Sequence, residues 1–264
     1  MTPLLNAAAL RAAAPDRWRR IDVVPETIST NADLAARAAD GADIDGTVLL
    51  AEHQSGGRGR QGRVWSAVPG TQILMSAGVS AGEVPAEAWG WLPLAAGLAV
   101  VDTVGPVLAR TDHSPKLKWP NDVLAGDGKL CGILCELAPG NQVIVGIGLN
   151  VSADARSLPD PAAVSVCSLG VSEPDRQQLV SVLLTRLDRR IVQWRTGDPV
   201  LFGDYRAHSA TLGQRVRAEL PHSAVIGTAV DLDASGALLI DSGAGPPITV
   251  SAGDVVHLRP DRGD

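Results

Sequence analysis

The segment that most constrains this 264-residue chain is a run of seven positions, 56–62, which holds four glycines and two arginines. Glycine at this density destabilises helices and strands, because each glycine loses a large backbone entropy when it is ordered. Apolar runs at 47–53 and 72–79 flank the segment and are predicted to be strands. The chain therefore carries a loop between two strands, and its backbone N–H groups can approach a ligand closely.

Three arginines, Arg58, Arg60 and Arg63, fall within six positions at this loop. Guanidinium groups so close together repel one another until an anion arrives, and they bind carboxylate or phosphate through paired N–H donors. A solvated arginine–glycine segment or a nucleic-acid tail would have a similar composition. However, the chain has 23 Lys and Arg against 29 Asp and Glu, a net charge of −6, which argues against non-specific nucleic-acid binding.

The remaining patterns predict several helices and strands. Ser29, Thr30 and Asn31 form a helix N-cap signal before 32–36. The apolar positions over 175–195 have helical spacing, and 1–20 is either a tail or a single docking helix. The apolar window 84–108 contains prolines and a charged residue, so it predicts a buried helix rather than a membrane span. Three further strands, separated by turn signals, predict an antiparallel meander: 116–119, 129–137 and 142–151.

Together these elements predict an α+β fold with a mixed, mainly antiparallel sheet flanked by helices. After Gly213, short β-rich pieces alternate with turns, which is typical of a small β-barrel. The expected division is an N-terminal tail at 1–20, a main domain at 21–212 and a C-terminal barrel at 213–264. Because aromatic residues make up only 3% of the chain, the core is expected to be aliphatic.

The cysteines and histidines indicate no metal site. The chain has three cysteines, an odd number: Cys131, Cys135 and Cys167. Their spacing matches neither Cys-x-x-Cys nor a zinc pattern, so we expect reduced thiols in a cytoplasmic protein. The five histidines form no metal-binding pattern such as His-Glu-x-x-His.

Three other motifs carry polar or glycine residues in unusual places. Residues 118–122, Lys-Trp-Pro-Asn-Asp, are either a polar hairpin turn or part of a site. Lys129 enters an apolar strand, which is costly unless the ammonium is paired, reaches solvent or faces a ligand. The glycines of 146–151, Gly-Ile-Gly-Leu-Asn-Val, mark either a bulge or the close approach of another group to the strand.

In combination these motifs resemble the biotin protein ligase family. The matching segments follow the family's order: 26–31 (Glu-Thr-Ile-Ser-Thr-Asn), Gln54 with 57–65, 118–122, Lys129 with 132–134, and 146–151. The tail at 205–260 resembles the family's C-terminal barrel. The resemblance implies a catalytic domain like that of class II aminoacyl-tRNA synthetases, followed by an SH3-like barrel. The first twenty residues are too short for the DNA-binding domain of bifunctional members, so the chain is similar to the short, monofunctional class.

The resemblance also implies a reaction. Family members join biotin to ATP, release pyrophosphate, and pass the biotinyl group from biotinyl-AMP to a lysine of a carrier protein. The implied ligands are ATP, Mg²⁺ and biotin, and the implied partner is the biotin carboxyl carrier domain of an acyl-CoA or pyruvate carboxylase. No DNA or membrane partner is expected, and no protein residues are expected to form a metal site.

The site residues implied by the resemblance fall into three groups. The resemblance implies catalytic roles for Lys129, Arg60 and Asp122. Biotin contacts go to Ser29, Thr30, Asn31, Gln54, Arg58, Gly59, Arg60 and Lys129, and nucleotide contacts go to Arg63, Trp65, Asn121 and Asn150. The need for cations is physical, because a carboxylate must meet a phosphate and each unit-charge pair at 4 Å is worth about 4 kcal/mol at an effective dielectric near 20.

Three other functions remain open at this stage. A lipoate–protein ligase would share the general fold, but the arginine loop and 118–122 favour biotin. A non-catalytic binding protein is disfavoured because Lys129 and Asn121 are both present. A nucleic-acid binder is disfavoured by the net charge.

Overall fold

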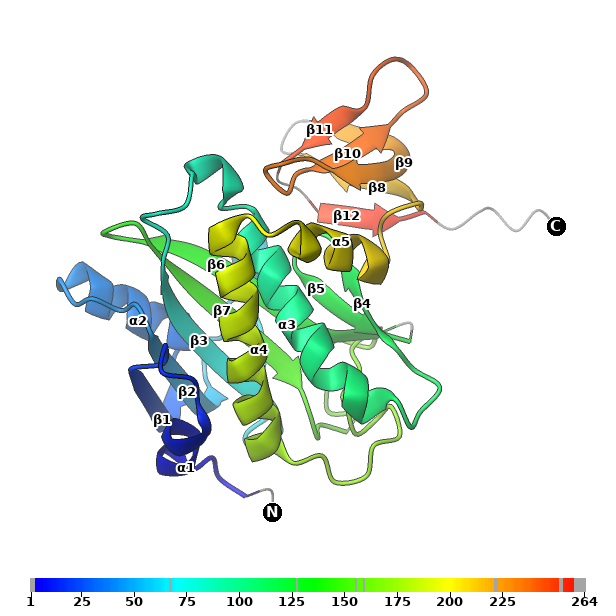
Figure 1. Ribbon diagram of the computed structural model, residues 1–264. Coiled ribbons are helices and arrows are strands. Elements are labelled where there is room, and N and C mark those ends of the chain that lie inside the picture. The colour runs from blue at the N-terminus through cyan, green and yellow to red at the C-terminus, as the bar shows by residue number, and fades with distance from the viewer. Residues whose placement is uncertain are drawn as a thin grey trace.

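The computed structural model describes residues 3–66, 68–126, 128–154, 156–158, 160–220, 223–251 and 254–258. Residues 1–2 of the expected tail and residues 259–264 of the expected barrel lie outside this set. These described residues form two sheets, a larger one of seven strands and a smaller one of five. Figure 1 shows how the two sheets are arranged.

The larger sheet is mixed and mainly antiparallel, which confirms the predicted fold class. Its strand order is β1-β2-β3-β7-β6-β5-β4, and only β1 and β2 pair in parallel. The strands are β1 (Arg20–Thr27), β2 (Thr47–Gln54), β3 (Gln72–Ser80), β4 (Pro115–Lys118), β5 (Asp122–Ala125), β6 (Gly128–Ala138) and β7 (Gln142–Asn150). β5 falls where the sequence indicated only turns. The turn is confined to residues 119–121, so Asp122 is the first residue of a strand.

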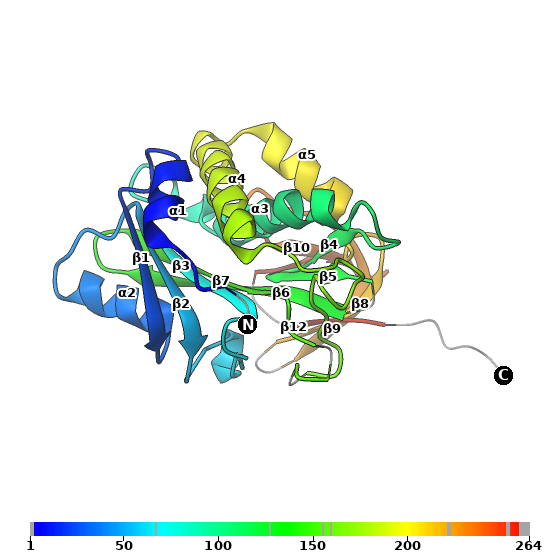
Figure 2. The same cartoon turned by 90° about the horizontal axis from the view of Figure 1, so that it is seen from below.

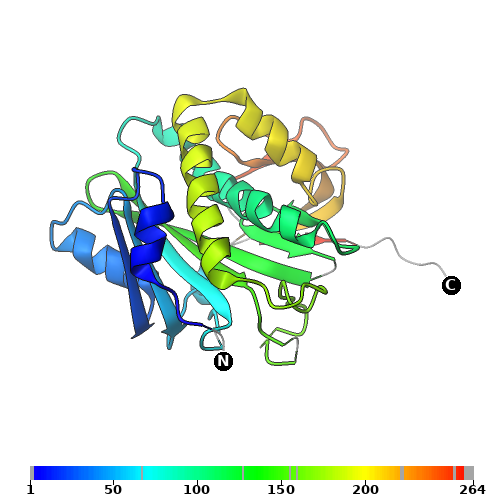
Figure 3. The same cartoon turned by 60° about the horizontal axis from the view of Figure 1, so that its bottom comes forward.

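Helices cover both faces of this sheet (Figure 2). Strand β2 shows why, since its apolar side chains alternate between the two faces. Leu49 packs with Leu34 and Ile144 under helix α2 (Thr30–Ala39), whereas Val48 and Leu50 belong to the main core beneath the other helices. Those helices are α1 (Ala7–Ala13), α3 (Trp91–Leu108), α4 (Arg176–Thr196) and α5 (Pro199–His208). Figure 3 shows α4 lying across α3 on this face.

The apolar window forms the buried helix that the sequence predicted, but the helix starts later than expected. Pro85 precedes a short 3₁₀ turn, η2 (Ala86–Ala88), and α3 begins only at Trp91, with Pro93 in its first turn where proline is tolerated. Within the described residues, Ala86–Leu108 is long and apolar enough to cross a membrane by length and composition. Its packing against the sheet and α4 makes it the central core helix.

The predicted helix after Asp175 is confirmed, and its ends are well capped. Asp175 accepts a hydrogen bond from the N–H of Gln178, and Gly197 ends α4 in the left-handed conformation (φ 62°). At the N-terminus, the structure has the docking helix rather than a free tail. Leu10 of α1 is fully buried, and Arg11 donates a hydrogen bond to the carbonyl of Ile21 in β1.

The smaller sheet follows α5 and is antiparallel throughout, and it lies where the sequence predicted the short β-rich pieces of a C-terminal barrel. Its strands are β8 (Arg215–Glu219), β9 (Ala224–Leu232), β10 (Leu238–Asp241), β11 (Ile248–Val250) and β12 (Asp254–His257), in the order β11-β10-β9-β8-β12. Two tryptophans of the larger domain hold the turn between β9 and β10. The indole N–H of Trp119 donates to the Gly236 carbonyl at 3.0 Å, and that of Trp91 donates to the Ala234 carbonyl at 3.1 Å.

Candidate active site

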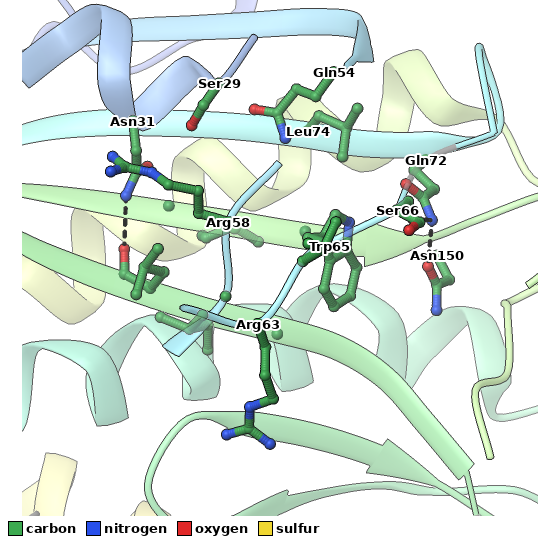
Figure 4. A pocket seen from close by; sticks show the side chains of 18 of the residues that line it. Ser29, Asn31, Gln54, Arg58, Arg63, Trp65, Ser66, Gln72, Leu74 and Asn150 are labelled. Atoms are coloured by element: carbon green, nitrogen blue, oxygen red, sulfur yellow. Dashed lines mark hydrogen bonds between the residues drawn. The ribbon is translucent and has the colours of Figure 1, made fainter. Parts of the chain in front are cut away.

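One pocket gathers almost all of the residues that the sequence singled out. It has a volume of about 200 Å³ and lies between the first turn of α2, the strands β2, β3, β6 and β7, and the arginine loop (Figure 4). The expected residues that line it are Ser29, Thr30, Asn31, Gln54, Arg58, Gly59, Arg60, Arg63, Trp65, Asn121, Lys129 and Asn150. Asp122 sits beside it, paired with Lys129. Segments up to 120 residues apart in sequence therefore form a single site.

One side of the pocket is a buried polar network at the start of α2. Ser29, one of the three residues in the predicted cap signal, is the N-cap of the helix. The Gln54 carbonyl oxygen accepts both the backbone N–H of Thr30 at 2.7 Å and its hydroxyl at 2.9 Å. The Ser76 hydroxyl completes the network, 2.7 Å from the Thr30 hydroxyl and 2.5 Å from the Asn31 carbonyl oxygen. These side chains are rigidly held, as recognition of a small polar ring requires.

Asn31 also connects the pocket to an acidic residue that the sequence did not reveal. Its amide nitrogen donates to the Leu134 carbonyl at 3.1 Å and to the Glu136 carboxylate at 2.6 Å. The same carboxylate pairs with the Arg58 guanidinium at 3.2 Å. Ser76 and Glu136 both lie within largely apolar strands, and no local motif marks them.

The arginine loop is a compact hairpin rather than an open coil. The Trp65 N–H donates to the Gly57 carbonyl at 2.9 Å, and the Gly59 N–H donates to the Arg63 carbonyl at 2.7 Å. A tight turn, η1 (Arg60–Gly62), closes the hairpin, with Gln61 at φ 56° and Gly62 at φ 73°. A Cβ atom on Gly57 would lie 2.4 Å from the Trp65 carbonyl oxygen, so this position requires glycine.

Two glycines of the central strands form a flat floor for the Trp65 indole. Gly132 of β6 and Gly148 of β7 are direct partners across the ladder. A Cβ atom would lie 2.9 Å from the indole at Gly132 and 2.6 Å from it at Gly148. The close approach that the glycine pattern indicated is therefore made by Trp65. Lys129 adds a cation–π contact, with its Nζ 5.5 Å from the indole centroid.

The opposite side of the pocket carries the cations. Lys129 Nζ lies 2.7 Å from Asp122 Oδ1, so the carboxylate orients the ammonium group. Arg60 donates to the side-chain carbonyl of Asn121 at 3.2 Å, and the Asn121 amide nitrogen donates to the Ile133 carbonyl at 2.9 Å. Lys129 on β6 and Arg60 on the arginine loop therefore bring two positively charged groups into the pocket.

The far end of the pocket is formed by Asn150 and by a neighbouring residue that the sequence analysis missed. Gln72 donates to the Asn150 carbonyl oxygen at 2.8 Å, and Asn150 donates to the Val164 carbonyl at 3.0 Å. The loop after β7 contributes Asp160 to the same wall. Among the described residues that line the pocket, the Trp65 indole N–H and the side-chain carbonyl oxygen of Gln72 are buried without a hydrogen-bond partner. Both therefore remain available to a ligand.

Neither a metal cluster nor an activated thiol is seen among the described residues. No group of three His, Cys, Asp or Glu side chains comes together there. Burial raises the pKa of the Cys135 thiol to about 12, and burial raises the pKa of Cys131 as well. Both thiols stay protonated at neutral pH, so they are poor nucleophiles.

A pocket that sets a buried polar subsite beside a cluster of cations is suited to a ligand that is neutral at one end and anionic at the other. A family model described as "Biotin/lipoate A/B protein ligase family" matches residues 29–151, and one described as "Biotin protein ligase C terminal domain" matches residues 211–258. The biotin–[acetyl-CoA-carboxylase] ligase of Mycobacterium tuberculosis is 54% identical, over 98% of each chain. The chain belongs to the biotin protein ligase family.

Solved structures agree with this assignment. The biotin protein ligase from Aquifex aeolicus in complex with biotin and ATP has a TM-score of 0.76 and 26% identity, covering 92% of this chain and 100% of its own. The Leishmania major enzyme with biotinyl-5-AMP has a TM-score of 0.60 and 26% identity, covering 88% and 99%. The bifunctional ligase/repressor BirA of Bacillus subtilis is 29% identical over 85% of this chain and 69% of its own length.

Proposed function

We propose that this chain forms biotinyl-AMP from biotin and ATP and then transfers biotin to a lysine of a biotin carboxyl carrier domain. One observation carries the proposal. The polar network of Thr30 and Gln54 opens directly onto the cations Arg60 and Lys129 within one pocket. A neutral ring system and an anionic chain end would fit these two halves. The match to a family model of the biotin ligase C-terminal domain favours biotin over lipoate.

In the first step, a biotin carboxylate oxygen attacks the α-phosphorus of ATP. A new C–O–P bond forms, the bond from the α-phosphorus to the bridging oxygen breaks, and pyrophosphate leaves with that oxygen. The protein supplies position and charge rather than a nucleophile. Lys129, held by Asp122, and Arg60, held by Asn121, lower the repulsion between the carboxylate and the phosphate.

We assign the biotin subsite to the α2 side of the pocket, with Ser29, Thr30, Asn31 and Gln54 around the ureido ring. Arg58 and Gly59 close this subsite from the loop. The nucleotide subsite is assigned to the other end, with Arg63, Trp65, Asn121 and Asn150. The unpartnered indole N–H of Trp65 supports that placement, since a buried donor needs an acceptor.

Mg²⁺ is proposed to enter as part of the substrate MgATP. Mg²⁺ on a nucleotide usually takes only one or two carboxylates and is otherwise held by phosphates and water. Asp160, on the pocket wall, is the carboxylate that we assign to it.

In the second step, the carrier lysine amine attacks the carbonyl carbon of biotinyl-AMP. An amide bond forms, AMP leaves with the oxygen, and the amine loses a proton. Asp122 is our candidate for receiving or orienting that proton. We further propose that the carrier belongs to an acyl-CoA or pyruvate carboxylase, that the protein is cytoplasmic, and that the chain divides near residue 212, between α5 and β8.

The test is incubation of the purified protein with biotin, MgATP and an isolated carrier domain. We expect a mass gain of one biotinyl group on the carrier lysine and none on a carrier whose target lysine is replaced by Arg. Lipoate in place of biotin serves as the specificity control. Modification by lipoate but not by biotin would overturn the assignment.

A further inference from the structure

Glu136 lies on the pocket side of β6 and contacts two of the proposed biotin residues at once. Its carboxylate accepts the Asn31 amide at 2.6 Å, and the Arg58 guanidinium lies 3.2 Å from both of its oxygens. Its side chain is 31% exposed, so both water and the loop reach it. One acidic residue therefore bridges helix α2 and the arginine loop.

Glu136, together with the Leu134 carbonyl, sets which way the Asn31 amide faces. The Asn31 amide nitrogen donates to the Leu134 carbonyl and to Glu136, while its carbonyl oxygen accepts from the Ser76 hydroxyl at 2.5 Å. Rotating the amide by 180° would set its carbonyl oxygen against a carboxylate, which is repulsive. The carboxylate thus keeps the carbonyl oxygen on the pocket side, where one of its lone pairs can accept a ligand N–H.

That carbonyl oxygen sits directly on the strand floor. A Cβ atom on Gly146 would lie 2.4 Å from it, so only glycine leaves the room that the amide needs here. An acceptor fixed in this way suits the N–H groups of a ureido ring. Because polar groups that are held in place lose little entropy on binding, their orientation affects affinity directly.

The second contact anchors the loop. Arg58 is 48% exposed, and exposed ion pairs contribute little to folding. Its effect is expected on the loop instead, because the hairpin from Gly57 to Trp65 carries Gly59 and Arg60 with it. The Arg58 contact with β6 thereby fixes the position of the loop over the subsite.

We propose that Glu136 is a positioning residue for biotin, acting through Asn31 and Arg58, and that it couples closure of the arginine loop to the orientation of the subsite. The proposal rests on the function proposed above. It predicts that removing the carboxylate weakens biotin binding while leaving the chemical step almost intact, because no cation that faces the reacting atoms is changed.

The test compares Glu136→Ala and Glu136→Gln with Glu219→Gln, a matched control that removes one carboxylate from the exposed Arg217–Glu219 pair on the smaller sheet. With pyrophosphate release as the assay, Glu136→Ala should raise the KM for biotin about tenfold or more, with kcat within threefold of the unmodified protein. Glu136→Gln keeps an acceptor for Asn31, so it should fall in between, and the control should not change.

Two further measurements separate positioning from general damage. In a double-mutant cycle, Glu136→Ala combined with Asn31→Ala should raise the KM little beyond Asn31→Ala alone, because both act through one contact. Trypsin should cut after Arg58 several-fold faster in Glu136→Gln than in the control, whose loop anchor is intact.

An unchanged biotin KM in both Glu136 variants, additive effects in the cycle, or a fall in kcat with KM unchanged would each overturn the proposal. If Glu136→Ala does not fold, Glu136→Gln decides the question, since it keeps the size of the side chain. Failure of the proposed function would look different, because the unmodified protein would then release no pyrophosphate with biotin.

Discussion

Gly148→Ala should place a methyl group beneath the Trp65 indole and leave the sheet intact. Gly148 has no left-handed conformation, so alanine can adopt its backbone angles. The new Cβ atom would lie 2.6 Å from the nearest indole carbon. Carbon atoms pack at about 3.5–4.0 Å, so the ring must retreat by about 1 Å.

The strain energy should destabilise the closed position of the arginine loop rather than the folded sheet. Overpacking typically costs about 1–3 kcal/mol, which corresponds to about 5- to 150-fold in an equilibrium constant. Trp65 belongs to a hairpin that can lift away from β7, so this strain opposes loop closure over the nucleotide. We therefore expect the KM for ATP and the rate of biotinyl-AMP dissociation to rise within that range, while the melting temperature changes by no more than a few degrees.

The assay measures pyrophosphate release against ATP concentration, together with thermal unfolding. Gly203→Ala in α5 is the matched control, because its Cβ atom would meet nothing within 4 Å. A normal KM for ATP in Gly148→Ala would refute the placement of Trp65 over the glycine floor. A large fall in melting temperature with an unchanged KM would show that the strain enters the sheet instead.

Three further predictions concern ionisable groups. Asp122→Asn should slow biotin transfer from preformed biotinyl-AMP to a carrier at least as much as it slows adenylate synthesis, and a normal transfer rate would leave this residue with no role in the second step. Arg176→Met leaves the Glu52 carboxylate buried without its cationic partner, so calorimetry should show a loss of about 3–5 kcal/mol in unfolding free energy. The double variant Arg176→Met with Glu52→Leu removes both charges and should lose less. Burial, aided by the charge of Lys118, lowers the pKa of His257 in the folded protein. As the pH falls below about 6.5, the unfolded chain therefore binds a proton at this residue before the folded protein does, and the folding stability declines from pH 7 to 5. The melting temperature of His257→Gln should decline less over the same pH range.

Local signals in the sequence were sufficient to predict much of the fold and most of the residues that line the pocket. The cap signal at 29–31 and the helical spacing over 175–195 are local features, because both depend on residues within a few positions of one another. The arginine loop could be recognised because its glycines exclude regular structure. The predicted site segments form one pocket because they lie in the first turn of α2, in the arginine loop and on the central strands, which are neighbours in the fold.

The features that the sequence did not reveal depend on long-range pairing. Glu136 lies 105 residues from Asn31 and 78 from Arg58, and nothing near it in sequence distinguishes it from a solvent-facing strand residue. Gln72 is buried beside Asn150 only because β3 and β7 are neighbours. The start of α3 was also misplaced, since hydropathy does not distinguish a helix from the 3₁₀ turn that precedes it.

The central claim is that this pocket joins a biotin carboxylate to the α-phosphate of ATP at Lys129. The most direct measurement omits the carrier and follows pyrophosphate release and retained biotinyl-AMP after mixing the protein with biotin and MgATP. We predict about one equivalent of biotinyl-AMP per chain, and a rate lower by about 10²–10³ in Lys129→Ala, since removing one preorganised charge-stabilising group costs about this much. No biotin-dependent pyrophosphate release by the unmodified protein, or a Lys129→Ala rate within threefold of it, would contradict the account.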